Sequence, residues 1–197
     1  ARYPFRAPGA THSVAFSPGV TREVVAAVIE KQFDRKKKEI SAGAPFNFSD
    51  EVTAPKIPTN SAALAQFHGW LQAQGIKPAP LGVAKLTDTI PIQDPLELAE
   101  RRKTGAAAAN RVFYFSSRFR QASFTERLRW HTEATHSNLG PDVVASTLVA
   151  DHPYFGGTGL GMGMVPDTAW GSYALAAVWF DLARTRAVDM AGIEDWM

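Results

Sequence analysis

Proline is the feature that most limits how this chain can fold. Proline fixes the backbone angle φ and lacks an amide donor, so neither a helix interior nor a central strand accommodates it easily. The sequence of 197 residues holds 13 prolines, most of them before residue 96, and with neighbouring glycines they create three loop-like stretches at 1–20, 41–58 and 76–93. Long loops are uncommon inside compact domains. We therefore predict that residues 1–93 form an extended arm with two helices that covers a neighbouring surface.

The two helices of this arm are predicted from apolar spacing at about 21–40 and 60–74. The inward stripe of the first helix comprises Val25, Val28, Ile29, Gln32 and Phe33. The second helix should begin after Thr59 or Asn60 as its cap, turn Leu64, Phe67 and Leu71 inward, and end at Gly75.

Residues 94–197 form a second, more regular region that is also predicted to be helical. Asp94-Pro95 predicts the start of a helix, and Gly105 predicts a break or bend in it. Ser123 and Glu126 fit a capping box that would begin a new helix at 124–135. A short apolar helix is expected from Pro141 to Ala150, and after a loop rich in Gly and Met the segment 168–180 reads as a C-terminal apolar helix. The predicted fold class is mainly α, with short helices joined by long extended Pro/Gly-rich segments and little or no sheet.

Charge is distributed unevenly although the net charge is only +2. Residues 101–129 carry eight basic side chains and one acidic one, whereas residues 130–197 carry two basic and eight acidic ones. Such polarity suits contacts with acidic protein faces or anionic lipid. Aromatic and Arg side chains dominate the energetics of many interfaces. The predicted partner-binding residues are Tyr3, Phe5, Phe16, Phe46, Phe48, Arg118, Arg120, Arg127 and Arg129.

The segment 153–180 has one formal charge in 28 residues, so it must be tested as a membrane span. A span needs about 20 predominantly apolar residues, and the clustered glycines together with Pro166 make this segment a poor one. The favoured interpretation is a buried helix after a Gly-rich loop. In the alternative, Trp170, Tyr173 and Trp179 face a membrane, because these residue types gather at bilayer interfaces.

Catalytic motifs are largely missing from the sequence. Absence of Cys excludes thiolate metal sites, iron–sulfur clusters and a Cys nucleophile. The Gly-rich run 157–163 has Met162 where a dinucleotide-binding loop needs Gly, and neither a P-loop nor a G-x-S-x-G motif is present. The alternative enzyme hypothesis is a metal or acid–base site built from Glu133, His136 and His152. The favoured prediction has no catalytic residue, no metal and no cofactor.

Arg and aromatic residues interleave from 111 to 130, which leaves RNA binding of the organellar ribosomal type as another alternative, although nucleic acid is not the favoured partner. No family is identified. The start at Ala1 suggests a removed tag or presequence. With its proline-rich arms, short helices and basic centre, the chain resembles in general character a nuclear-encoded accessory subunit of a respiratory complex or an ATP synthase. The resemblance implies a non-catalytic structural subunit of a mitochondrial, inner-membrane-associated assembly, with other protein subunits and anionic lipid as partners.

Overall fold

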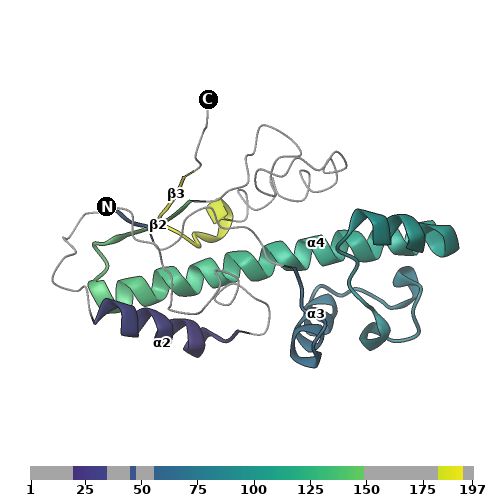
Figure 1. Cartoon of the computed structure of the whole chain (residues 1–197), viewed down its shortest axis with the longest axis horizontal. Helices are drawn as coiled ribbons and strands as arrows, with labels where there is room; N and C mark the ends of the chain where they lie inside the picture. The colour runs from purple at the N-terminus through teal and green to yellow at the C-terminus, as the bar shows by residue number, and fades with distance from the viewer. Residues whose placement is uncertain (1–19, 35–44, 48–55, 149–181, 193–197) are drawn as a thin grey trace.

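One long helix organises the molecule. The computed structural model describes residues 20–34, 45–47, 56–148 and 182–192 and is mainly helical (Figure 1). Helix α4 spans Pro95–Leu139, 45 residues, and begins as the sequence predicts, with the Asp94 carboxylate accepting the Leu96 amide at 2.8 Å and Pro95 in the first turn. Gly105 departs from helical geometry (φ −177°, ψ 75°), so the predicted break is a kink within α4.

The predicted new helix start at Ser123 is wrong, because α4 continues through it without interruption. The apolar stripe of the helix runs on across this point, with Phe119, Phe124 and Leu128 all buried. Glu126 does not serve as a cap. Its carboxylate accepts the Trp130 indole N–H at 2.9 Å and pairs with Arg129 at 3.1 Å, and these i+4 and i+3 contacts suit a helix interior.

The first half of α4 supports a cluster that we call the front core. Helix α3, Ser61–Ala73, is capped by the Asn60 side chain, which accepts the Ala63 amide at 2.9 Å, and the chain turns after it at Gly75, where φ is 71°. Two 3₁₀ turns follow, η1 at Ala79–Leu81 and η2 at Leu86–Asp88. The buried residues of the front core are Ile57, Ala63, Phe67, Leu71, Leu81, Ile92, Leu98, Ala109, Val112 and Phe119.

The second half of α4 supports a separate cluster, the rear core. Helix α2, Arg22–Phe33, is capped by Thr21 and lies along α4 (Figure 1). Its inward residues Val25, Ile29 and Phe33 are almost fully buried, as predicted. Val28 was predicted to share this stripe and is instead 36% exposed. The buried residues of the rear core are Val25, Ile29, Phe33, Phe124, Leu128, Ala134, Val143, Ala145, Leu182 and Ala187.

A small parallel sheet lies beside the rear core. Its strands are β1 (Pro45–Asn47), β2 (Val144–Leu148) and β3 (Met190–Gly192) in the order β1-β2-β3. Phe46 is in register with Ala145, and Ser146 with Met190. The short helix predicted to begin at Pro141 is therefore wrong. Pairing on both sides of β2 with distant segments outweighs the local helical preference of this stretch.

The described parts of the front half bury many of their apolar residues on this chain. Residues 20–34 pack into the rear core, and residues 56–93 pack around α3 and the first half of α4. Residues 1–93 were predicted to form an extended arm, whereas these two segments fold against α4 of the same chain. The long connection in residues 56–93 is held by specific bonds. The Ile92 backbone amide donates to the Ser116 hydroxyl at 3.1 Å, and the Gln93 side-chain Nε2–H donates to the Ile57 carbonyl at 3.0 Å.

Candidate functional site

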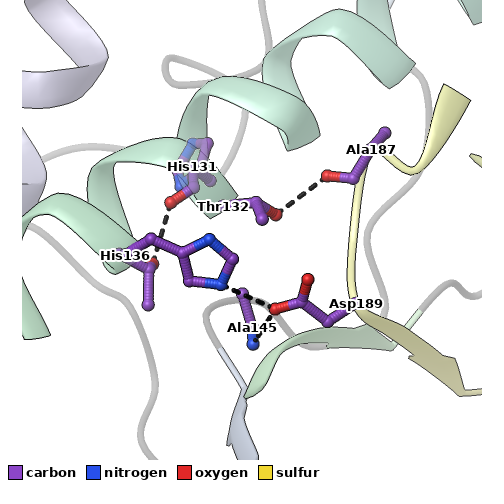
Figure 2. A network of polar contacts seen from close by, with 7 residues as sticks. His131, Thr132, His136, Ala145, Ala187 and Asp189 are labelled. Atoms are coloured by element: carbon purple, nitrogen blue, oxygen red, sulfur yellow. Dashed lines mark hydrogen bonds and ion pairs between the residues drawn. The ribbon is translucent and has the colours of Figure 1, made fainter. Parts of the chain in front are cut away.

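Polar groups converge where the end of α4 meets the sheet. We call this cluster the polar junction; it comprises His131, Thr132, Thr135, His136, Ala145, Ala187 and Asp189 (Figure 2). Helical spacing turns Thr132 and His136, one turn apart, toward the segment that precedes β3. The junction therefore combines three parts of the chain that are distant in sequence.

Asp189 is the centre of the polar junction. Its Oδ2 accepts the His136 Nε2–H at 2.8 Å and the Ala145 amide at 2.7 Å, while its own amide donates to the Ala145 carbonyl at 3.0 Å. One carboxylate thus fastens the last turn of α4 to β2 and to the start of β3. Hydrogen bonds to a charged group are stronger than neutral ones, so this carboxylate is well suited to hold the three elements together.

Buried groups complete the junction. The Thr132 hydroxyl donates to the Ala187 carbonyl at 2.8 Å, and the Thr135 hydroxyl donates to the His131 carbonyl at 2.8 Å. His131 is 3% exposed, and burial lowers its pKa to about 4. Its imidazole is therefore neutral at pH 7, and it becomes charged in the folded protein only in acid.

Replacing Asp189 with alanine should loosen the polar junction. The change removes the shared acceptor of His136 and the Ala145 amide, and the loss of two such bonds is expected to lower the free energy of unfolding by about 2 kcal/mol. Urea denaturation measures this difference. Asp142→Ala is the control, since Asp142 is exposed in the turn before β2 and should change stability by less than about 0.5 kcal/mol. Equal stability of the two variants would contradict the role given to Asp189.

The structure describes two of the three predicted metal or acid–base residues, Glu133 and His136, and they have different partners. Glu133 pairs with Arg22 of α2 at 2.7 Å, whereas His136 contacts Asp189 beside β3 at 2.8 Å. Helix α2 and strand β3 lie on different sides of α4 (Figure 1). His152 lies outside the described residues. Within the ranges that the structure describes, no group of three His, Asp or Glu side chains could hold a metal ion. In the described part, Glu133 and His136 serve to link structural elements.

The four arginines predicted to form one partner-binding surface differ in their surroundings. Arg127 is only 4% exposed, and its guanidinium carbon lies 4.0 Å from the centre of the Trp130 ring. Burial lowers its pKa to about 10, which leaves it charged at neutral pH. Arg127 therefore does not belong to an outward face, contrary to the prediction. Arg118, Arg120 and Arg129 are half-buried, and Arg118 donates to the Gln121 side chain at 2.8 Å.

Most of the predicted aromatic contact residues lie outside the described part of the chain. These are Tyr3, Phe5, Phe16, Phe48, Trp170, Tyr173 and Trp179. Phe46 is placed in β1. Among the helices that the structure describes, none is both long and apolar enough to cross a bilayer.

Sequence reasoning missed two features. The first is Asp189, which carried no local signal because its partners come from α4 and β2. The second is an outward apolar face on α2 that includes Val24 and Val28, which are 49% and 36% exposed. A signal for this face was present, since Val24, Ala27 and Val28 repeat at i, i+3 and i+4 beside the inward stripe.

Three comparisons with known proteins find no relative of this chain. No family model matches the chain. A search of curated proteins finds no match, and a search of solved structures finds none.

Proposed function

We propose that this chain is a non-catalytic accessory subunit of a larger protein assembly, to which it contributes structural contacts. Its partners are other protein subunits and, at the charged surfaces, anionic lipid. Attachment to a mitochondrial inner-membrane complex of the respiratory-chain or ATP-synthase type is the finer part of the proposal. That part rests on the general character of the sequence.

The observation that carries the proposal is the placement of apolar surface along α4. The helix holds the front core and the rear core in one elongated body (Figure 1). Large apolar side chains remain exposed near both of its ends: Val24 and Val28 on α2, which lies along the second half, and Leu96 in the first turn. Neighbouring exposed apolar residues, such as Val24 and Val28 one turn apart, favour contact with other proteins.

The use of polar groups supports the same proposal. Glu133 pairs with Arg22, and His136 pairs with Asp189, so these side chains hold α2, α4 and the start of β3 together. His131 is neutral and buried at pH 7. A catalytic acid or base must reach its substrate. These side chains instead tie one element of the fold to another, which favours a structural role over catalysis.

The size of the endogenous protein tests this proposal. We expect the chain, extracted under mild conditions and detected with an antibody, to migrate on a native gel at a mass far above its own 21.4 kDa. The recombinant chain alone serves as the size standard. Migration of the endogenous protein at the same position as this standard would refute the proposal.

A further inference from the structure

Helix α2 is apolar on two sides, and α4 covers one of them. Val25, Ile29 and Phe33 are buried in the rear core. Val24, Ala27 and Val28 face outward and are exposed. Their i, i+3, i+4 spacing makes a continuous stripe, which Lys31 ends one turn later. We call Val24, Ala27 and Val28 the outer stripe.

Apolar residues on two opposite sides of a helix are typical of a helix that packs between two layers. Here the first layer is α4, with which α2 makes its main contacts. The exposure of the outer stripe means that the described residues supply no second layer. Two valines at helical spacing, with an alanine between them, leave a shallow surface onto which another helix could pack closely.

An acidic edge runs beside the outer stripe. Glu23, Glu30 and Asp34 are spaced i, i+7 and i+11, so they line one side of α2, and all three are exposed. The Glu23 carboxylate accepts hydrogen bonds from its own backbone amide and from the Thr21 side chain, and both lower its pKa, so it is ionised at neutral pH. Glu30 and Asp34 form no ion pair with any residue that the structure describes.

We propose that the outer stripe and acidic edge of α2 dock an amphipathic helix of a partner protein whose apolar side is flanked by Lys or Arg. The apolar side covers Val24, Ala27 and Val28, and the basic flank meets Glu23, Glu30 and Asp34. This inference rests on the proposed function and names the kind of partner that one surface of the subunit accepts. Such a helix on an apolar surface is a recurring mode of protein recognition.

Charge disfavours two other binding partners for the outer stripe, a second copy of α2 and the segment 149–181 of this chain. A second copy of α2 packed antiparallel about a two-fold axis would bring acidic edge against acidic edge, and like charges at that contact oppose the pair. The apolar segment 149–181 of this chain contains no Lys or Arg, so it cannot supply the basic flank. An amphipathic partner helix with basic residues can cover the outer stripe and pair with the acidic edge at the same time.

Two synthetic amphipathic peptides with the same apolar stripe, one flanked by Lys and the other by Glu, test the proposal on the full-length chain. Fluorescence anisotropy at low salt should show the Lys peptide binding about tenfold more tightly than the Glu peptide, which corresponds to about 1.4 kcal/mol. Added salt should reduce this difference, because exposed charges are screened. The double variant Glu30→Lys/Asp34→Lys should reverse the preference.

A second variant tests the apolar part of the surface. Val24→Ser/Val28→Ser should weaken binding of the Lys peptide about fivefold or more, whereas Tyr114→Ser, a change at an exposed residue of α4, should not. Circular dichroism and thermal melting establish that each variant is folded. Equal binding of the two peptides, no binding of either, or indifference to both double variants would overturn the proposal. A dimer that dissociates in the valine variant would overturn it in favour of a second copy.

The two proposals can fail separately. If the endogenous chain migrates in a large assembly and the valine variant enters that assembly as efficiently as the parent, the docking proposal fails and the subunit proposal stands. If the endogenous chain migrates alone, the subunit proposal fails whatever the peptides do.

Discussion

Replacing Phe124 with alanine is expected to lower the free energy of unfolding by about 3–5 kcal/mol. Phe124 is fully buried in the rear core, where the inward residues of α2 and the residues of α4 and β2 meet. Truncation removes the apolar contacts of the ring and leaves a cavity that the neighbouring elements only partly close. Urea denaturation followed by circular dichroism measures the loss.

The matched control for this change lies on the same helix. Tyr114 is 58% exposed, and Tyr114→Ala should change the free energy of unfolding by less than about 0.5 kcal/mol. Phe67→Ala, in the front core, should cost about as much as Phe124→Ala but raise hydrogen exchange first in residues 56–93. A loss below about 1 kcal/mol for Phe124→Ala would contradict the rear core as described.

Acidification should destabilise the protein through His131. Burial lowers the pKa of this imidazole from 6.5 to about 4 in the folded state. Between these values the unfolded chain binds a proton that the folded chain does not, so the stability held above pH 6.5 is lost as the pH falls toward 4. A shift of this size corresponds to about 3 kcal/mol.

The variant His131→Leu isolates this contribution from that of the carboxylates. We expect the parent to lose about 3 kcal/mol more than the variant between pH 7 and pH 4, as measured by urea denaturation at each pH. An NMR titration of the His131 ring in the parent protein gives an independent reading that does not depend on how the variant folds. Identical pH profiles of parent and variant, or a ring that titrates near pH 6.5, would contradict the prediction.

Local signals predicted the helices correctly where the residues that start or stop them act over a single turn. The Asp94-Pro95 start, the Asn60 cap and the turn at Gly75 each depend on backbone groups within a few residues. The kink of α4 at Gly105 is also local, because it depends on the backbone angles of that one residue. The mainly helical fold class followed from these signals and from apolar spacing.

The candidate site was less predictable because its residues meet across the sequence. Glu133 and His136 look like a pair at i, i+3, yet their partners Arg22 and Asp189 lie far away along the chain and turn them apart. Arg127 was predicted to be a surface charge because it lies in a basic stretch, but it is buried with its guanidinium against the Trp130 ring. The partners of Glu133 and His136 have no signal within one helical turn, whereas Trp130 follows Arg127 by three residues on the same helix.

The sequence by itself determined where α2, α3 and α4 begin, and that the chain is mainly helical, since capping, proline and glycine act through neighbouring backbone groups. Only the tertiary structure decided that α4 runs on through Ser123, that residues 144–148 form a strand, and that Asp189 joins α4 to β2. These outcomes depend on burial and on hydrogen bonds between segments that become neighbours only when the chain folds, so no local pattern could contain them.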